Sequence, residues 1–269
     1  MTNRQIKVVV HGALGRMGRE VTNALCCEPK IQVAGAVELK ASQDELPLPD
    51  DLGTVPFSSD LGYILTSCQP NVLVDFTTAK ATLPAARLAL KQGVNLVIGT
   101  TGLTADELGE IDQLARTYKV GVVVAANFAL GAVLMIHLAR IAAKYLDYAE
   151  IVELHHHLKL DSPSGTALAT ARAMVQARGK PFSSPSEQGK VSSSRGEQVE
   201  GVTIHSVRLP GLLAHQEVVL GALGQTLHIR HDTISRECFI PGVILAIKEV
   251  VKRQGLIYGL DTLLGLSEE

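Results

Sequence analysis

Ile6-Lys-Val-Val-Val-His-Gly-Ala-Leu-Gly-Arg-Met-Gly18 is the stretch that decides the fold of this chain. It joins a short apolar run to a glycine-rich turn, and a helical pattern over residues 19–27 follows. Strand, glycine turn and helix occur in this order where a fold binds a dinucleotide. In such a unit Gly12 permits the tight turn, Gly15 lets the backbone approach a pyrophosphate, and Gly18 lets the helix pack closely on its strand.

The residues after this turn support a bound ligand. A second apolar run over residues 31–37 ends at Glu38, about twenty residues beyond the glycines, where an acid meets the ribose hydroxyls of a dinucleotide. Glu38 suits NAD, whereas the nearby cation Lys40 could pair with the extra phosphate of NADP. The spacing is GxxGxxG, with Leu14 in place of the commoner glycine, so a turn without a ligand is the alternative.

Alternating strand-like and helix-like segments in the first half indicate a doubly wound, parallel, Rossmann-like sheet. Further strands are expected over residues 71–76, 94–98 and 120–125. A capping box formed by Thr104 and Glu107 opens a helix that runs to Tyr118. Ligands of such sheets bind beyond the carboxyl ends of the strands. The segments expected there, lining the nicotinamide half of a pocket, are Asp75-Phe-Thr77, Gly99-Thr-Thr-Gly102 and Ala125-Ala-Asn-Phe128.

The second half has a different pattern and predicts an α+β domain. A helix is expected over residues 131–145 and a strand over 148–154, and the polar stretch 179–196 reads as a mobile loop. Three runs look like antiparallel strands, at 202–208, 217–220 and 226–230. The helix expected over 241–251 returns to the first domain. We therefore expect a dinucleotide-binding domain over 1–127, completed by 238–269, and a substrate-binding and oligomerisation domain over 128–237.

Glu153-Leu-His-His-His-Leu-Lys-Leu-Asp-Ser-Pro-Ser-Gly-Thr166 gathers three imidazoles, one amine and two hydroxyls flanking a glycine. Imidazole can give or take a proton near neutral pH. The turn over 163–166 precedes a helical run, so its backbone N–H groups and hydroxyls would face an anion such as a carboxylate or a phosphate. The stretch predicts a site that binds an anion and transfers a proton.

Two other interpretations of the histidines stay open. Adjacent histidines can bind zinc, but on a strand only His155 and His157 would share a face, and no HExxH or paired-cysteine spacing accompanies them. We therefore expect no metal. Alternatively, the histidines simply end the strand expected over 148–154.

Composition narrows the class of protein. The chain has 269 residues, 46% of them hydrophobic, and a net charge of −2, so it holds one large or two medium domains. There is no basic excess to suggest nucleic acid. The N-terminal residues lack a hydrophobic signal region, and no apolar run is long enough for a membrane span. A cytoplasmic location and four reduced cysteines are expected.

These motifs resemble those of the bacterial dihydrodipicolinate reductase family along nearly the whole chain. The most specific is Glu153-x-His-His-x-x-Lys-x-Asp-x-Pro-Ser-Gly-Thr-Ala167. It is supported by the Gly12–Gly18 turn with Arg16-Met17, by Gly99–Gly102, by Ala126–Phe128 and by the ending Gly255–Gly265.

The resemblance implies a homotetramer that reduces a cyclic unsaturated dicarboxylate, 4-hydroxy-tetrahydrodipicolinate, with NADPH or NADH in the diaminopimelate route to lysine. It implies that His155 gives or takes a proton and that Lys159 is a second proton donor. The residues implied to bind the substrate are His156, Ser164, Gly165 and Thr166. Those implied to bind the cofactor, with Lys40 added from its charge, are Gly12, Ala13, Leu14, Gly15, Arg16, Met17, Glu38, Gly99, Thr100, Thr101, Ala125, Ala126, Asn127 and Phe128.

The chain departs from the family pattern at a few positions. His157 and Leu158 stand where many members carry arginine and histidine, and Leu39 stands where an arginine often meets the NADP phosphate. Cofactor preference therefore stays open, with Lys40 or Arg16 as substitutes for that arginine. The alternatives are a dehydrogenase of the aspartate or homoserine type and a regulator that senses NAD(H) without turnover. The His-His-x-x-Lys cluster disfavours the regulator, because a sensor needs no proton donor.

Overall fold

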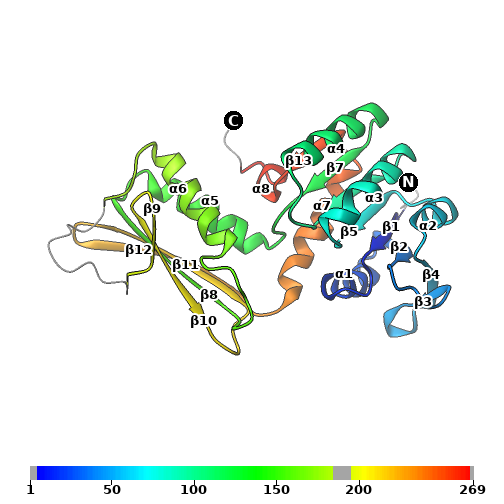
Figure 1. The fold of residues 1–269 in the computed structure, drawn as a ribbon, viewed down its shortest axis with the longest axis horizontal. Helices are drawn as coiled ribbons and strands as arrows, with labels where there is room; N and C mark the ends of the chain where they lie inside the picture. The colour runs from blue at the N-terminus through cyan, green and yellow to red at the C-terminus, as the bar shows by residue number, and fades with distance from the viewer. Residues whose placement is uncertain (1–4, 184–194, 267–269) are drawn as a thin grey trace. The chain divides into compact units, whose positions relative to one another are not determined.

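The computed structural model describes residues 5–183 and 195–266. The chain divides into two compact units, unit 1 formed by residues 1–130 and 239–269, and unit 2 formed by residues 131–238 (Figure 1). The polar stretch expected to be a mobile loop spans residues 179–196, and residues 184–194 of it lie outside the described residues. Residues 1–4, in which no signal region was expected, also lie outside them. Within the described ranges no helix is long and apolar enough to cross a membrane.

Unit 1 is built on an eight-stranded sheet of order β13-β7-β6-β5-β1-β2-β4-β3. Its strands are β1 (Ile6–His11), β2 (Ile31–Val37), β3 (Glu45–Pro47), β4 (Thr54–Ser58), β5 (Val72–Asp75), β6 (Asn95–Ile98), β7 (Gly121–Val124) and β13 (Gly255–Tyr258). All neighbours pair in parallel except β3 and β4. The sheet grows in opposite directions from β1, towards β2 on one side and β5 on the other. The predicted Rossmann-like fold is confirmed, and the switch point lies between β1 and β5.

Helices cover both faces of this sheet. They are α1 (Arg16–Cys26), α2 (Leu61–Cys68), α3 (Ala79–Lys91), α4 (Ala105–Tyr118), α7 (Ile240–Val250) and α8 (Leu260–Leu263), with a 3-10 turn at Pro49–Asp51. Helices α2, α3 and α4 share a core with Val9 and the strand residues that face the same way. Helices α1 and α7 contact each other and the strands. Because side chains alternate along β1, Val8 and Val10 lie on the face of the sheet opposite to that of Val9, where α1 and α7 pack. The capping box predicted at Thr104 is present at the start of α4.

Unit 2 holds a five-stranded sheet of order β12-β11-β8-β10-β9. Its elements are α5 (Leu130–Ala143), β8 (Tyr148–His155), α6 (Gly165–Arg178), β9 (Glu197–Val199), β10 (Val202–Arg208), β11 (Ala214–Ala222) and β12 (Gln225–Thr233), and a 3-10 turn at Arg236–Phe239 leads out of it. The expectation that the strand at 202–208 is antiparallel is wrong for its pairing with β8, because β10 runs parallel to β8. The chain passes through α6 between the two strands, and such a crossover returns the second strand in the direction of the first.

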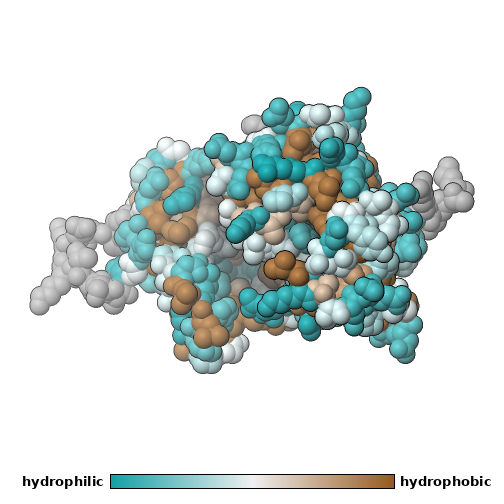
Figure 2. All heavy atoms as spheres, turned by 45° about the vertical axis from the view of Figure 1, so that its right-hand side comes forward, coloured by the Kyte–Doolittle hydropathy of each residue, from teal (hydrophilic) through white to brown (hydrophobic). Residues whose placement is uncertain are grey.

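The sheet of unit 2 is buried on the face that carries α5 and α6. Its core includes Ile151 on β8, Ile204 on β10 and Val218 on β11, packed with Met135 and Met174 from the helices. Figure 2 shows that on the visible face of the molecule hydrophobic residues are interspersed with hydrophilic ones.

Candidate active site

The inward face of the unit 2 sheet changes from apolar to polar towards the carboxyl end of β8. Ile151 belongs to the core, whereas the next two inward-facing residues of β8 are Glu153 and His155. Arg208 on β10 stands opposite His155 in the parallel register. The alternation of β8 therefore brings two ionisable side chains to the end of an otherwise apolar face, and β10 adds a third.

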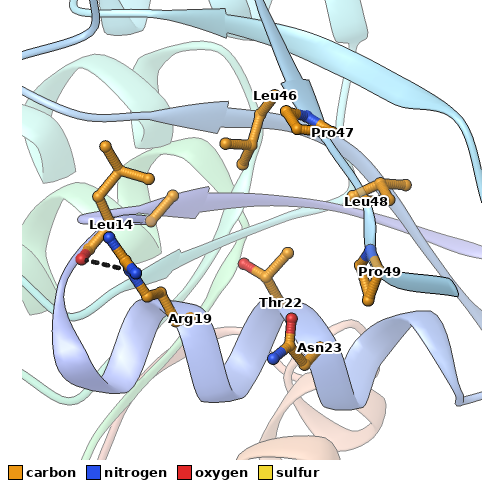
Figure 3. Close-up of a pocket in the computed structure, with 9 residues that line it drawn as sticks. Leu14, Arg19, Thr22, Asn23, Leu46, Pro47, Leu48 and Pro49 are labelled. Carbon is orange, nitrogen blue, oxygen red and sulfur yellow. Dashed lines mark hydrogen bonds between the residues drawn. The ribbon is translucent and has the colours of Figure 1, made fainter. Parts of the chain in front are cut away.

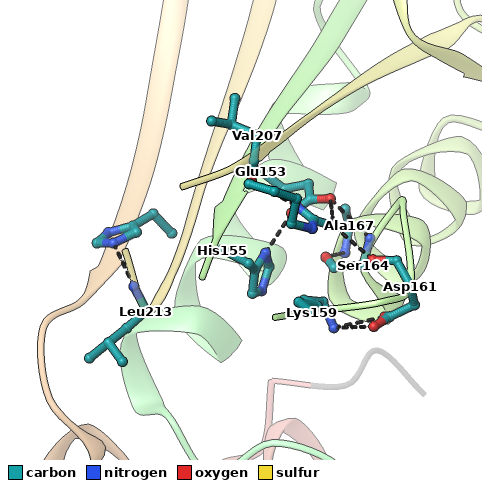
Figure 4. A network of polar contacts seen from close by, with 10 residues as sticks. Glu153, His155, Lys159, Asp161, Ser164, Ala167, Val207 and Leu213 are labelled. Carbon is teal, nitrogen blue, oxygen red and sulfur yellow. Dashed lines mark hydrogen bonds and ion pairs between the residues drawn. The ribbon is translucent and has the colours of Figure 1, made fainter. Parts of the chain in front are cut away.

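Glu153 is the centre of this group (Figure 4). Its side chain is fully buried, and its Oε2 lies 2.5 Å from Nδ1 of His155. Arg208 donates from Nη2 to Oε1 at 2.7 Å and from Nη1 to Oε2 at 2.9 Å, and the backbone N–H of Ser164 donates to Oε1 at 3.2 Å. Burial raises the pKa of Glu153, but hydrogen bonds from His155, Arg208 and Ser206 outweigh it and hold the pKa at about 2. The carboxylate is therefore ionised at neutral pH.

The segment between β8 and α6 is tied to the same group. Nη2 of Arg208 donates to the carbonyl oxygen of Asp161 at 2.8 Å. The amine of Lys159 donates to both carboxylate oxygens of Asp161 at 2.7 Å, and this contact lowers the pKa of Asp161. Lys159 is thus held near His155 by a carboxylate that lies two residues further along the chain (Figure 4).

Helix α6 starts in this segment with free donors. Ser164 is the N-cap residue, and its hydroxyl accepts from the backbone N–H of Ala167 at 3.2 Å. Gly165 and Thr166 occupy the first two helical positions, where a backbone N–H has no acceptor within the helix. Gly165 is exposed, and a Cβ built on it would meet nothing within 4 Å. An anion can approach this N-terminus closely.

The three adjacent histidines occupy different environments. β8 ends at His155, so the strand alternation that would pair His155 with His157 does not extend to His157. His156 is partly buried and His157 is exposed. Among residues 5–183 and 195–266, no three His, Cys, Asp or Glu side chains gather as a metal site requires.

In unit 1 the glycine turn follows β1 at the switch point. Gly12 has a φ of 82°, and a Cβ there would lie 2.7 Å from the carbonyl oxygen of Phe76. A Cβ on Gly18 would lie 2.0 Å from the carbonyl oxygen of Gly12. Glycine at position 12 therefore lets the turn lie against Phe76, and glycine at position 18 lets the helix lie against the turn. Arg16 and Met17 begin α1, and their backbone N–H groups have no acceptor within the helix.

Glu38 follows β2 and is fixed beside this turn. Its Oε2 accepts from the backbone N–H of Leu14 at 3.1 Å, and its Oε1 accepts from that of Leu39 at 3.0 Å. Lys40, two residues further on, is exposed. A cavity of about 300 Å³ adjoins Leu14 (Figure 3), and it is lined by Ala13, Leu14, Arg19, Thr22, Asn23, Leu46, Pro47, Leu48 and Pro49. Sequence reasoning missed this cavity, because four of its nine lining residues come from β3 and the residues after it, which carry no recognisable strand pattern.

The carboxyl ends of β5, β6 and β7 also meet. Asp75 is buried, and its Oδ1 accepts from the hydroxyl of Thr77 at 2.6 Å. The backbone N–H of Thr77 donates to the hydroxyl of Thr100 at 2.9 Å. The rings of Phe76 and Phe128 lie 5.9 Å apart. The structure therefore brings the segments 75–77, 99–102 and 125–128 together at one edge of the sheet.

His11 joins this cluster, and no sequence motif predicted it. Its Nδ1 lies 3.5 Å from Oδ1 of Asp75. Burial lowers the pKa of His11, and the charges of Asp75 and Glu38 oppose that effect. Only the pairing of β1 with β5 places His11 opposite Asp75.

The fold and the glycine turn define a class, the two-domain oxidoreductases built on a dinucleotide fold. Residues 6–128 match the family described as "Dihydrodipicolinate reductase, N-terminus", and residues 131–264 match "Dihydrodipicolinate reductase, C-terminus". The chain belongs to the dihydrodipicolinate reductase family, so the resemblance noted in the sequence is confirmed. Membership of this family of reductases implies a nicotinamide cofactor.

Individual relatives are similar over nearly their whole length. A 4-hydroxy-tetrahydrodipicolinate reductase of Dehalococcoides mccartyi is 56% identical over 97% of this chain and 99% of its own. One from Moorella thermoacetica is 49% identical over 96% and 98%. The solved structure of dipicolinate-bound dihydrodipicolinate reductase from Paenisporosarcina sp. TG-14 is 36% identical, covers 96% of this chain and 99% of its own, and superposes with a TM-score of 0.87.

Proposed function

We propose that this chain reduces 4-hydroxy-tetrahydrodipicolinate to tetrahydrodipicolinate with NADPH or NADH, in the diaminopimelate route to lysine. The observation that carries the proposal is the 56% identity, over 97% of the chain, to a relative with this activity in its name. The dipicolinate bound to the structural relative supports a cyclic dicarboxylate as the ligand. The Glu153–His155 pair beside the N-terminus of α6 supplies the chemistry that such a substrate needs.

In unit 2, His155 and Lys159 are the proposed catalytic residues. A bound nicotinamide supplies the hydride, and its addition to a C=N or conjugated C=C bond leaves electron density that must be protonated. His155 is two residues from a buried, ionised carboxylate that can stabilise its protonated form. Lys159 contributes a positive charge and a second proton. Because Lys159 pairs with Asp161 in this structure, a substrate carboxylate would compete with Asp161 for the amine.

The substrate carboxylates are assigned to the start of α6. His156, Ser164, Gly165 and Thr166 form the proposed contacts, in which the free N–H groups of the first helical turn bind one carboxylate. These donors are uncharged, so Lys159 provides the charge that a dianion requires.

In unit 1 the residues fit a dinucleotide. The absence of a side chain at Gly12 and Gly18 allows the turn, and the start of α1 presents backbone N–H groups to a pyrophosphate. Glu38 keeps lone pairs that can accept a ribose hydroxyl, and we assign Lys40, two residues further on, to a phosphate on that ribose. The remaining proposed cofactor contacts are Ala13, Leu14, Gly15, Arg16, Met17, Gly99, Thr100, Thr101, Ala125, Ala126, Asn127 and Phe128.

In this proposal residues 1–127 together with 238–269 form the domain that binds the dinucleotide, and residues 128–237 form the domain that binds the substrate. The same second domain would hold a homotetramer together, and the enzyme would work in the cytoplasm.

The proposal is tested by following cofactor oxidation at 340 nm with substrate freshly made by the preceding synthase, comparing NADH with NADPH. We expect oxidation only when the cyclic dicarboxylate is present. Turnover with aspartate semialdehyde alone, and none with the cyclised adduct, would refute the proposal.

A further inference from the structure

The buried carboxylate of Glu153 determines which nitrogen of His155 carries a proton. An ionised carboxylate only accepts hydrogen bonds, so the contact of 2.5 Å between Oε2 and Nδ1 of His155 requires a hydrogen on Nδ1. In the neutral ring the lone pair then lies on Nε2. Nε2 is the nitrogen that remains for proton exchange with a substrate.

Arg208 moderates the charge that His155 experiences. It donates to both oxygens of Glu153, and its Nη2 also bonds to the carbonyl oxygen of Asp161. Each oxygen of Glu153 therefore shares its negative charge with a guanidinium, and His155 faces a carboxylate that is already partly neutralised. Removing Arg208 would leave His155 beside a full, buried negative charge.

We propose that Glu153 is the positioning residue of His155, fixing its Nδ1–H tautomer and stabilising its protonated form, and that Arg208 sets how strongly it does so. The proposal rests on the proposed function, because that function makes His155 the proton donor or acceptor. It assigns roles to two residues that act through His155.

Other charged groups near His155 are few among the described residues. The segment before α6 contributes Lys159 and Asp161, which pair with each other. The first turn of α6 carries no acidic residue, and β11 places Ala214 and Gln216 opposite His155 and Glu153. His231 on β12 is in register with Gln216, so it lies one strand further away. Glu153 is thus the charged group in contact with His155, and Arg208 is the charged group that holds both oxygens of Glu153.

The test compares Glu153→Gln with Arg208→Gln in the full chain. The ring ¹⁵N shifts of His155, identified by their loss in His155→Asn, report its tautomer. The Nδ1–H tautomer should dominate in the wild type and lose that dominance in Glu153→Gln.

Kinetics supply the second readout. In Glu153→Gln we expect kcat to fall about 10²-fold, the lower end of the contribution of a general acid or base. The pH at which kcat changes should move to lower pH in Glu153→Gln and to higher pH in Arg208→Gln, because each variant removes a charge near the proposed proton donor, while KM for the cofactor stays constant. Glu153→Asp keeps a carboxylate at a greater distance, so it should recover part of the activity and show a smaller shift. The Asp variant also decides the question if the Gln variant does not fold.

Glu150 offers a matched control. It lies on the same strand but on the opposite face, and it pairs with His205 at 2.8 Å and with Arg195. Glu150→Gln also removes a carboxylate from between a histidine and an arginine. It should leave the tautomer of His155 and the pH dependence of kcat unchanged.

The proposal is overturned if the tautomer of His155 is the same in Glu153→Gln as in the wild type. It is also overturned if Glu153→Gln and Arg208→Gln move the pH dependence of kcat in the same direction. Absence of turnover by the wild type, with the Nδ1–H tautomer dominant in the wild type and not in Glu153→Gln, would overturn the proposed reaction and leave the positioning role supported.

Discussion

Replacing Glu153 by glutamine should lower the free energy of unfolding of unit 2 at neutral pH and have little effect near pH 2. In the folded chain burial raises the pKa of this carboxyl, but hydrogen bonds from His155, Arg208 and Ser206 lower it from 4.5 to about 2. A pKa that is lowered by folding stabilises the protein above the unfolded value, and this stability disappears as the pH falls through the folded value. At 1.36 kcal/mol per pKa unit, the carboxylate contributes about 3 kcal/mol at pH 7.

An independent argument gives the same size. In Glu153→Gln the guanidinium of Arg208 loses its carboxylate, and breaking a buried ion pair by removing one partner costs about 3–5 kcal/mol. The stability difference between wild type and variant should therefore be about 3 kcal/mol at pH 7 and should shrink to a few tenths of a kcal/mol near pH 2.

The assay is urea unfolding at several pH values between 7 and 2, followed by peptide-level hydrogen exchange. Exchange in β8 reports on unit 2 and exchange in β7 reports on unit 1, because a chain with two compact units need not unfold in one step. Glu150→Gln is the control: its side chain is 41% exposed, so its loss should cost less than about 1 kcal/mol. A stability difference for Glu153→Gln that stays constant from pH 7 to pH 2 would refute the reasoning.

Three further predictions concern the two proposed sites and the glycine turn. In a steady-state assay, His155→Ala should lower kcat by about 10²–10⁴-fold and leave the affinity for the cofactor unchanged. His157→Ala, which changes an exposed side chain, should have little effect on kcat. A larger loss of kcat in His157→Ala than in His155→Ala would contradict the assignment of His155. Lys40→Ala should raise KM for NADPH about 10-fold and leave KM for NADH nearly unchanged, and equal effects on both would remove Lys40 from the phosphate site. Gly18→Ala should destabilise unit 1 by at least about 1–3 kcal/mol in thermal unfolding, because its Cβ would lie 2.0 Å from a carbonyl oxygen. Gly109→Ala is the control, because Gly109 lies in a helix and its new Cβ would have nothing within 4 Å. This variant should stabilise unit 1 by about 0.5–1 kcal/mol. Equal losses of stability in the two variants would show that crowding at Gly18 is not the cause.

The fold of unit 1 could be predicted because its signals are local. Apolar strands, a glycine turn and capped helices are each specified by adjacent residues, and their repetition implies a parallel sheet. The strands β3, β4 and β13 and the helices α2 and α8 were missed. β3 spans only Glu45–Pro47, and β4 contains Pro56. Proline is tolerated near a sheet edge but removes the pattern by which a strand is recognised.

The direction of β10 and the partners of His155 could not be predicted for a shared reason. Both depend on register between distant segments, since Glu153 and Arg208 are 55 residues apart in the chain. The sequence did show an acidic residue at an inward position of a strand, two residues before His155. An acid at a buried position needs a partner, and this signal could have identified Glu153, although only the pairing of β8 with β10 identifies Arg208.

The ribosome completes unit 2 before it completes unit 1, because unit 1 is formed by the two ends of the chain. All of unit 2 has been synthesised once Cys238 emerges, whereas unit 1 still lacks α7 and the edge strand β13. Until Gly255–Tyr258 arrives, β7 presents an unpaired edge made of buried valines, and such an edge can pair with another nascent chain. Translation that stalls between residues 238 and 255 should therefore leave a folded unit 2 attached to a sheet prone to aggregation.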